Sequence, residues 1–342
     1  MFDQAKRHAL KYFDALDNAS QQTVGAVLDA HCIADVSLDA VHPFNECRGT
    51  EQITKILWSP LLESFKGLKR RQDIFIAGEG EVDGQVWVMS MGHLMGLFES
   101  AWLGIPATRQ LTMLRYAEFL QIRDGAIQAI GFFIDILDVM RQANVYPLPP
   151  ATGAHFTVPG PRTHDGILLE PCDPESGRRT LSLVNRMVDD LVALNKSGVA
   201  NPAPSYLATC WADDMVWYGP CGIGSTYTIE RYQEQHQYPF RQSLTQTVFN
   251  GHKARIAEGN YAGWYGWANL STTPLGGLMG MTSGSRADMR VVDVYRREGD
   301  KLVENWVLID IPWWLKQQGL DVLERNRRIR NPSLWRDPAQ GD

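Results

Sequence analysis

The chain has 342 residues, 44% of them hydrophobic and 21% charged, which is the composition of a globular protein long enough for two domains of about 150 residues each. Its formal net charge of −6 gives no electrostatic reason to hold a polyphosphate, so nucleic acid is excluded as an expected partner. No apolar run approaches the roughly 18 residues of a membrane span, and the charged N-terminus is unlike a signal peptide, so we expect a cytoplasmic protein with no membrane partner.

The first half of the chain predicts helices followed by strands. Apolar residues recur at helical spacing from Ala5 to Leu16, a second helix is expected over about 21–32, and a third helix after the first strand holds Trp58. The segments "RRQDIFIAGEGEVDGQVWVMSMGHLMGLF" and "TRQLTMLRYAEFLQIRDGAIQAIGFFIDI" are rich in β-branched and aromatic residues and are interrupted at turn residues. Such runs are typical of antiparallel hairpins, so the sequence predicts an α+β domain over residues 1–147 with a curved sheet.

A segment rich in proline and glycine follows, over residues 148–177. It shows neither helical nor strand periodicity, which indicates a linker of about thirty residues. Loops of that length are usually disordered or functional. Either the segment is a plain linker, or its "PRTHDG" stretch lies across a pocket mouth with His164 and Asp165.

The second half repeats the same order of elements. A helix is expected around Leu181 to Leu191, a shorter one over 203–212, and a third that holds His236, followed by strands from 244 to 311. This predicts a second α+β domain over residues 178–325 and a tail over 326–342. The basic residues near that boundary indicate a solvated helix end rather than a binding patch; they are Arg325, Arg327, Arg328 and Arg330.

The two halves are related by an internal repeat with an offset of 175 residues. The segment "FFIDILDVMRQANV" at 132–145 corresponds to "VLIDIPWWLKQQGL" at 307–320, so that Asp135 matches Asp310 and Gln142 matches Gln317. Likewise "DVSLDAVHPFNECRGTEQI" is answered by "DDMVWYGPCGIGSTYTIERY". Two copies of one supersecondary unit are therefore expected.

Asp135 and Asp310 are the candidate catalytic acids. Alternation along the last strand places Asp310 on one face with Trp306 and Leu308, and Asp135 on one face with Phe133. Burial on such a face raises a carboxyl pKa toward the range useful for proton transfer. The alternative is that each aspartate caps the helix that follows it. Duplication preserves caps as readily as catalysts, so both interpretations stay open.

Two histidines are further catalytic candidates, and several other residues are candidates for substrate binding. His93 lies between glycines in "MGHLMG", where a ligand has room to approach, although a lone strand histidine is more often a core residue. His236 lies in the amphipathic segment "ERYQEQHQYPFRQ". The candidates for substrate binding are Trp58, Arg109, Phe133, Trp217, Tyr218, Trp264 and Trp306. For Arg109, an ordinary surface position is the simpler explanation.

No motif in the sequence points to a metal or an organic cofactor, so we expect none. The sequence contains no HExxH, GxSxG or phosphate-loop pattern and no GxGxxG between a strand and a helix. The five cysteines are scattered and include no CxxC pair, which argues against a disulfide framework and against a zinc site.

These features together resemble the SnoaL-like polyketide cyclase branch of the NTF2-like superfamily, present twice. The matching text is "GHLMGLFESAWLGIPATRQ" with "DGAIQAIGFFIDILDVMRQ" in the first half, and "YGPCGIGSTYTIERYQEQHQYPFR" with "GDKLVENWVLIDIPWWLKQQG" in the second. The resemblance implies a cone-shaped, cystatin-like α+β barrel around an apolar pocket in each half. It places the family's catalytic aspartate on Asp135 and Asp310 and its histidine on His93. The second half lacks that histidine, and His236 is the candidate partner there.

The resemblance implies a cofactor-independent enzyme that acts on a small hydrophobic carbonyl compound by aspartate acid/base catalysis. Aldol cyclisation is the family's type reaction, and isomerisation or dehydration would use the same groups. Two other hypotheses are a binding protein for a small hydrophobic ligand that performs no catalysis, and a dimerisation module that uses its sheet faces. The resemblance also implies that the two halves pack as an intramolecular pseudo-dimer and that whole chains can form a homo-oligomer.

Overall fold

The computed structural model describes residues 2–331 and contains two mixed sheets, each built by one half of the chain. We call residues 3–142 the first half and residues 174–330 the second half. The first-half sheet has the strand order β2-β1-β6-β5-β4-β3. Its strands are β1 (Cys32–Ala40), β2 (Asn45–Arg48), β3 (Phe65–Glu79), β4 (Val86–Phe98), β5 (Leu111–Arg123) and β6 (Ala126–Ile134). The β1–β6 pair is parallel and the others are antiparallel.

The helices of the first half follow the predicted order. The amphipathic helix α1 (Asp3–Asp17) buries Ala5, Ala9, Tyr12, Phe13 and Leu16, which recur at helical spacing. The other first-half helical elements are α2 (Val24–His31), α3 (Thr50–Ile53), the π-helical turn η1 (Thr54–Trp58), α4 (Ser59–Ser64) and α5 (Ile136–Gln142). The predicted hairpin turns at Asp83-Gly84 and Asp124-Gly125 are confirmed, and both glycines have positive φ.

The second half repeats this arrangement. Its sheet has the order β10-β11-β12-β13-β7-β8, with β9 pairing with β11. The strands are β7 (Trp211–Tyr218), β8 (Thr226–Tyr227), β9 (Leu244–Phe249), β10 (Ala254–Glu258), β11 (Tyr261–Pro274), β12 (Ala287–Glu298) and β13 (Lys301–Ile309). The helical elements are α6 (Pro174–Ser197), α7 (Pro204–Leu207), α8 (Ile229–Tyr232), η2 (Gln233–Gln237), α9 (Tyr238–Ser243), η3 (Leu278–Gly280), α10 (Ile311–Gln317) and α11 (Val322–Arg330).

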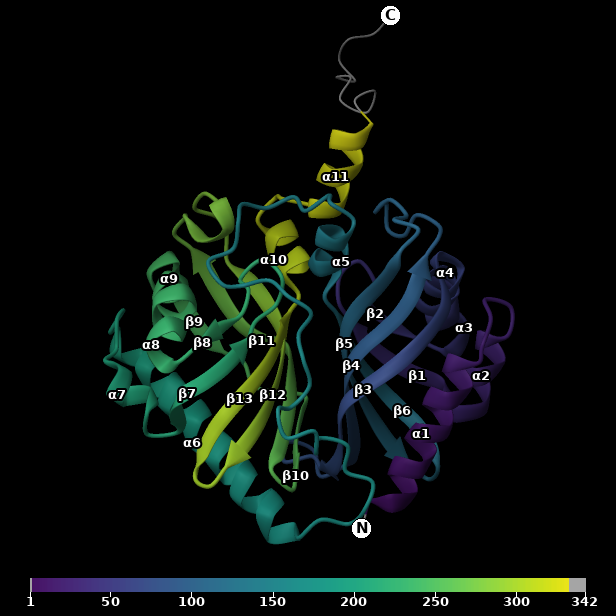
Figure 1. Ribbon diagram of the computed structural model, residues 1–342, viewed down its shortest axis with the longest axis horizontal. Coiled ribbons are helices and arrows are strands. Elements are labelled where there is room, and N and C mark those ends of the chain that lie inside the picture. Colours follow the sequence, from purple (N-terminus) through teal and green to yellow (C-terminus); the bar gives the residue numbers. More distant parts are fainter. Residues whose placement is uncertain (1, 332–342) are drawn as a thin grey trace, which may run out of the picture.

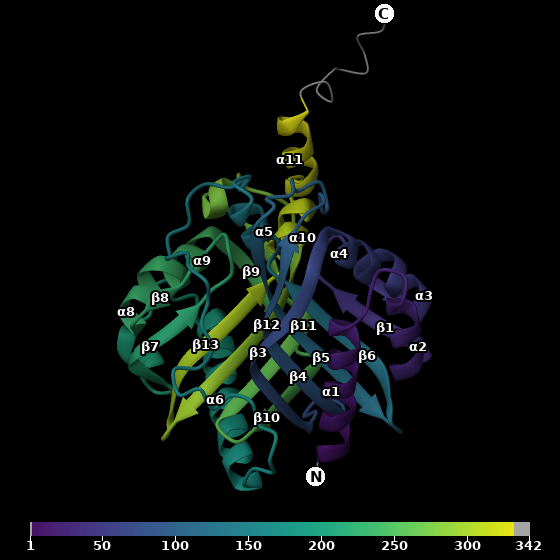
Figure 2. The same cartoon turned by 45° about the vertical axis from the view of Figure 1, so that its right-hand side comes forward.

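The two sheets face each other at the centre of the molecule, with α1 to α4 outside one and α6 to α9 outside the other (Figures 1 and 2). Aromatic rings meet across this junction, since the ring of Phe119 lies 5.1 Å from that of Tyr265. Gly78 allows a close approach of the two sheets, because a Cβ atom there would lie 3.0 Å from the Cβ of Ile256. The inner sheet faces are therefore occupied within one chain.

Two ion pairs join the halves at the junction: the Lys6–Glu258 pair is buried, whereas the lysine of the Lys253–Asp39 pair is exposed. Lys6 of α1 lies 2.5 Å from Glu258 of β10, and the second carboxylate oxygen of Glu258 accepts the backbone N–H of Ala77 at 2.8 Å. Lys253 also pairs with Asp39 across the halves, at 2.6 Å. Unpaired charges are costly to bury, so these contacts favour one fixed arrangement of the two sheets.

The segment between the halves is held in place by hydrogen bonds. Ile167 forms a parallel bridge with Phe75 of β3, and the carbonyl of Pro159 accepts the indole N–H of Trp306 at 2.9 Å. Asp165 accepts the hydroxyl of Tyr261 at 2.5 Å. The alternative position of His164 and Asp165 at a pocket mouth is not observed, because neither residue lines the large cavity described below.

The element boundaries differ slightly from the predicted domain limits. Helix α6 begins at Pro174, inside the predicted linker 148–177, and α11 runs on to Arg330, past the predicted end of the second domain at 325. The predicted tail 326–342 is described only to residue 331, so 332–342 lie outside the described residues. Within residues 2–331, the helices are all too short or too polar to cross a bilayer.

Candidate functional site

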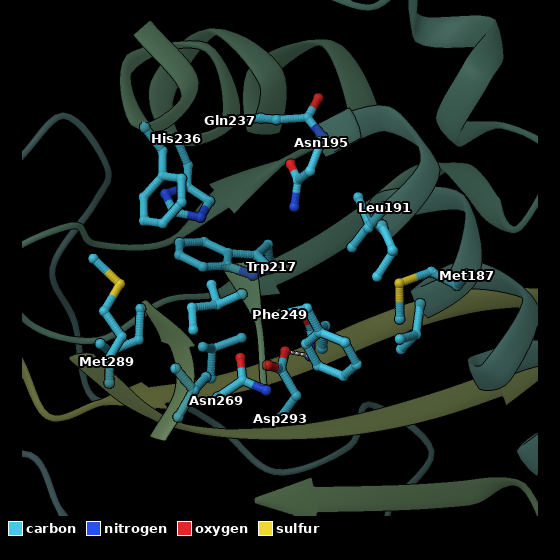
Figure 3. Close-up of a pocket in the computed structure, with 18 of the residues that line it drawn as sticks. Met187, Leu191, Asn195, Trp217, His236, Gln237, Phe249, Asn269, Met289 and Asp293 are labelled. Atoms are coloured by element: carbon cyan, nitrogen blue, oxygen red, sulfur yellow. Dashed lines mark hydrogen bonds between the residues drawn. The ribbon is translucent and has the colours of Figure 1, made fainter. Parts of the chain in front are cut away.

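A cavity of about 180 Å³ lies between α6, the α8–η2–α9 segment and the sheet of the second half (Figure 3). Its walls are mostly aromatic and aliphatic, and its polar members are few. The aromatic and sulfur-containing side chains are Trp211, Trp217, Tyr232, Phe240, Phe249, Trp264, Tyr295, Met187 and Met289. The charged and polar ones are Asn195, His236, Gln237, Arg241, His252, Asn269, Asp293 and Asn305.

Strand alternation determines which residues of β13 reach this cavity. Asn305, Val307 and Ile309 line it, whereas Trp306 points to the opposite sheet face, where its indole bonds to the linker. Successive side chains of a strand point to opposite faces, so one face serves the cavity and the other serves the junction between the halves. The predicted alternation is confirmed, but the predicted pocket face was wrong.

Asp293 of β12 is the carboxylate of the cavity. The side-chain amide of Asn305 donates a hydrogen bond to its Oδ1 at 2.9 Å. Burial raises the pKa of Asp293 to about 7, and hydrogen bonds from Asn305 and from Tyr295 oppose that rise. At neutral pH both the acid and the carboxylate are therefore populated, which is the condition for general acid/base catalysis.

Two histidines line the cavity as neutral rings, each stacked on a tryptophan. His236 of η2 stacks on Trp217 with ring centroids 4.2 Å apart, and Figure 3 shows the pair on the helical side of the cavity. His252 stacks on Trp264 at 3.9 Å. Burial lowers the pKa of both histidines to about 3. Neither ring supplies a positive charge at neutral pH, so Asp293 has no histidinium neighbour to lower its pKa.

Arg241 lies at the edge of the cavity, but its guanidinium is used to hold the end of α6. It donates to the backbone carbonyls of Leu194 and Val199 and to the side chain of Asn195. A cation at a helix C-terminus is stabilised by the free carbonyls there. Its donors are thus engaged by the protein, and its role at this point is structural.

Of the predicted site residues, the structure brings His236, Trp217 and Trp264 together in this cavity. Tyr218 and Trp306 instead stack on each other at 5.4 Å, on the junction side of the sheet. Phe133 also faces the junction, 5.9 Å from Trp267. The remaining binding candidates lie in the first half: Trp58 is buried against Phe132, and Arg109 is exposed in a turn with φ 56°.

His93 lies in a narrow cleft between the halves rather than in a large pocket. The cleft has a volume of about 20 Å³ and is also lined by Arg115, Asp135 and His155. The Nδ1 atom of His93 is 3.7 Å from a carboxylate oxygen of Asp73. A space of this size holds about one water molecule, so the cleft has no room for an organic substrate.

Asp135 and Asp310 are helix caps that also tie the halves together, which is the second of the two interpretations. Asp135 accepts the N–H of Asp138 at 3.1 Å and the N–H of Cys221, in the other half, at 2.8 Å. Asp310 does the same in reverse, accepting the N–H of Trp313 at 3.2 Å and that of His42 at 2.8 Å. Each carboxylate therefore caps its own helix and holds a loop of the opposite half.

Neither aspartate lines the second-half cavity, although burial raises the pKa of each to about 6. Arg290 forms an ion pair with Asp310 at 3.2 Å, and Arg115 donates to the carbonyls of Tyr218 and Gly219 near Asp135. The prediction that these carboxylates point into an apolar pocket with Phe133, Trp306 and Leu308 was wrong. The face they share with those residues is the junction face.

The first half has an acid at the position that corresponds to Asp293, but this acid is locked in an ion pair. Glu118 lies 175 residues before Asp293, its side chain is fully buried, and it pairs with Arg70 at 2.7 Å. The guanidinium of Arg70 also lies over the rings of Phe13 and Tyr116, at 4.0 and 4.5 Å. These side chains fill the interior that in the second half is a cavity.

The sequence contained a signal for this acid that the prediction missed. Glu118 and Asp293 match at the same offset as the aspartates that were chosen, and both stand in the middle of a β-rich run. Asn305, which hydrogen-bonds Asp293, corresponds to Ile130 in the first half. An acid repeated with a changed partner indicates a site that differs between the halves.

As for metals, within residues 2–331 no group of three or more His, Cys, Asp or Glu side chains is placed to hold an ion.

Comparisons with known proteins found similarity among solved structures only. No protein-family model and no curated protein matches the sequence. Among solved structures, a protein from Jannaschia sp. CCS1 provisionally described as a SnoaL-like polyketide cyclase is 21% identical, with a TM-score of 0.33, over 43% of this chain and 94% of its own. A provisionally described polyketide cyclase from Xanthomonas campestris pv. campestris is 18% identical, with a TM-score of 0.33, over 41% of this chain and 96% of its own.

An NTF2-like protein from Burkholderia xenovorans LB400 is 12% identical, with a TM-score of 0.30, over 42% of this chain and 97% of its own. The structural neighbours are thus SnoaL-like polyketide cyclases and NTF2-like proteins, and each matches about 40% of the chain. At these TM-scores and identities the similarities carry no inference about activity, so the function is argued from the cavity alone.

Proposed function

We propose that the second half is a cofactor-independent enzyme that transfers a proton on a small hydrophobic carbonyl compound, with Asp293 as the general acid/base. The observation that carries the proposal is a single buried carboxyl, with a pKa of about 7, in a cavity lined mainly by apolar side chains. The reaction type that fits is an aldol cyclisation, an isomerisation or a dehydration.

In the proposed mechanism, ionised Asp293 removes a proton from the carbon next to the bound carbonyl group. The amide of Asn305 holds Oδ1 of Asp293 at 2.9 Å and so limits the rotation of the carboxyl group. In an isomerisation, the protonated acid returns the proton to another carbon of the enolate. In an aldol cyclisation, the enolate carbon forms a bond to a second carbonyl carbon of the ligand, and the alkoxide oxygen formed there takes the proton. The aromatic walls exclude water and position the ligand.

The first half is proposed to have a structural role. Its acid, Glu118, is held by Arg70 at 2.7 Å in an interior filled by Phe13 and Tyr116. Burial raises the pKa of Glu118 and Arg70 opposes that rise, but the side chain of Glu118 is fully buried in this filled interior, so a ligand has no access to it. The activity is therefore assigned to the second half alone.

The test is exchange of α-protons into D₂O, followed by ¹H NMR, with cyclohexanone as the probe. We expect the wild-type protein to accelerate exchange and Asp293→Asn to abolish the acceleration, while Asp213→Asn, which removes an exposed carboxylate from the same half, has no effect. Acceleration that persists in Asp293→Asn contradicts the assignment. Cyclohexanone binding without any acceleration in the wild-type protein favours the alternative, a ligand-binding protein.

The pH dependence of exchange supplies a second check on the same residue. The rate is expected to rise with pH, to be half-maximal near pH 7 and to level off well above it, where the base form of Asp293 is fully populated. Asn305 lowers the pKa of Asp293, so Asn305→Leu should move this inflection to higher pH. An inflection that does not move in Asn305→Leu means that another group controls the rate.

A further inference from the structure

Three residues of neighbouring strands are paired in sequence on the sheet face that borders the cavity. Arg255 of β10 is paired with Trp264 of β11, and Trp264 is paired with Asp293 of β12. Residues paired across strands have neighbouring side chains on one sheet face. His252 stacks on Trp264 from just before β10, so Trp264 lies between His252 and the proposed acid.

Arg255 determines which ring nitrogen of His252 carries the proton. Its Nε donates a hydrogen bond to Nδ1 of His252 at 2.9 Å. Arginine is a donor only and does not lose its charge in proteins, so Nδ1 must be the acceptor and the proton must reside on Nε2. The low pKa of His252 keeps the ring neutral in this form.

The Nε2–H group of His252 is a buried donor without a protein acceptor. The atom is inaccessible to solvent, makes no hydrogen bond within the protein, and belongs to a residue that lines the cavity. Buried polar groups are nearly always paired, because an unpaired group has lost its hydrogen bonds to water without replacing them. The protein supplies no acceptor for this N–H group, so an acceptor has to come from a bound molecule whose entry uncovers Nε2.

The guanidinium that orients His252 is itself held by both halves. Its Nη1 donates to Oδ1 of Asn185, on α6, at 2.7 Å and to a carboxylate oxygen of Glu81, in the first half, at 3.1 Å. Asn185 in turn donates to the other oxygen of Glu81 at 2.5 Å. The first half thus contributes an anchor to the network behind the cavity wall of the second half.

We propose that the Nε2–H of His252 donates a hydrogen bond to an oxygen atom of an uncharged ligand in the second-half cavity, and that Arg255, anchored by Glu81 and Asn185, is the positioning residue that keeps this donor in place. The inference rests on the proposed function for the choice of a carbonyl ligand. It assigns a role to the first half as a support for the site. The ligand class is a compact neutral ketone, since a cavity of about 150 Å³ accommodates benzene and this one measures about 180 Å³.

The first experiment compares cyclohexanone with methylenecyclohexane, which has the same shape but no acceptor oxygen. Dissociation constants are measured by NMR titration for the wild-type protein and for His252→Phe, which retains a flat ring against Trp264. We expect His252→Phe to weaken cyclohexanone binding roughly five- to tenfold, the value of one hydrogen bond, and to leave methylenecyclohexane unchanged. An equal loss for both ligands, or no loss for either, overturns the proposal.

The second experiment tests the positioning role by ¹⁵N NMR of the histidine side chains. In the wild-type protein His252 should show a protonated Nε2 and an unprotonated Nδ1, and Arg255→Leu should convert this signature to a mixture of the two forms. Lys253→Met is the matched control, because it removes a neighbouring tie between the halves, the ion pair with Asp39, without touching His252. A protonated Nδ1 in the wild-type protein, or the same change in Lys253→Met, overturns the positioning role.

These outcomes are separable from those of the proposed function. If ketone binding depends on His252 but no exchange occurs in the wild-type protein, the catalytic proposal fails and the donor assignment stands. If exchange depends on Asp293 but His252→Phe affects the binding of cyclohexanone and of methylenecyclohexane equally, the donor assignment fails and the catalytic proposal stands.

Discussion

Replacing Asp293 by asparagine should make the protein more stable at alkaline pH, because the ionised carboxylate of Asp293 is unfavourable in the buried cavity. The pKa of Asp293 rises from 3.8 to about 7 on folding. A displacement of about three pH units corresponds to roughly 4 kcal/mol, at about 1.4 kcal/mol per unit. Asparagine has the same shape, retains an oxygen for the amide of Asn305, and never ionises.

The direction in which the free energy of unfolding changes with pH depends on whether the folded or the unfolded protein binds the proton more tightly. Below about pH 4 both the folded and the unfolded protein hold it, and the carboxyl has no net effect on stability. Between about pH 4 and 7 the unfolded chain releases the proton while the folded protein retains it, so the free energy of unfolding falls progressively as pH rises. Well above pH 7 both states are ionised and the loss is complete, at an upper value of roughly 4 kcal/mol.

Urea unfolding followed by circular dichroism, at intervals between pH 4 and 8.5, measures this effect. The free energy of unfolding of Asp293→Asn minus that of the wild-type protein should be near zero at pH 4 and should grow to several kcal/mol by pH 8. Other buried acids, Asp135 and Asp310, titrate equally in both proteins and cancel in the difference. Asp213→Asn, at an exposed position, should show no such growth. A difference for Asp293→Asn that is independent of pH would refute the reasoning.

Two further predictions concern residues outside the cavity. Asp310→Ala should lower stability by about 3–5 kcal/mol, because it leaves Arg290 buried without its partner, yet it should leave proton exchange per folded molecule unchanged; a loss of exchange would restore Asp310 as a catalytic candidate. Arg70→Met and Glu118→Leu should each lower stability by about 3–5 kcal/mol, whereas the double variant should lose less than the sum, as measured in a double-mutant cycle. Strictly additive losses would mean that the two charges do not stabilise each other.

The residues that the internal repeat retains are those that hold the scaffold. Gln142 bonds the backbone N–H and carbonyl of Met113, at 3.0 and 2.8 Å, and Gln317 bonds those of Asp288, at 3.0 and 2.9 Å. The repeated aspartates likewise cap their helices and hold the opposite half. The cavity residues differ instead, since Asn305 and His236 correspond to Ile130 and Leu61. Similarity between the halves therefore marked the scaffold, and differences marked the site.

The sequence by itself determined the order of helices and strands, the two sheets and the residues that alternate along each strand. These follow from local patterns: helical spacing in α1, turn glycines at Gly84 and Gly125, and β-branched runs between them. The sequence also indicated that Asp135 and Asp310 precede helices, which is enough to predict a cap.

Only the tertiary structure decided which face of each strand borders the cavity. Both faces of β13 are buried, one against helices and one against the other half, so hydrophobicity along the strand does not distinguish them. Glu118 is paired with Arg70, whereas Asp293 borders a cavity. Arg70 is 48 residues from Glu118 in the sequence and 2.7 Å from it in the fold. Such contacts between distant segments depend on how the sheets and helices pack, and no local pattern contains that information.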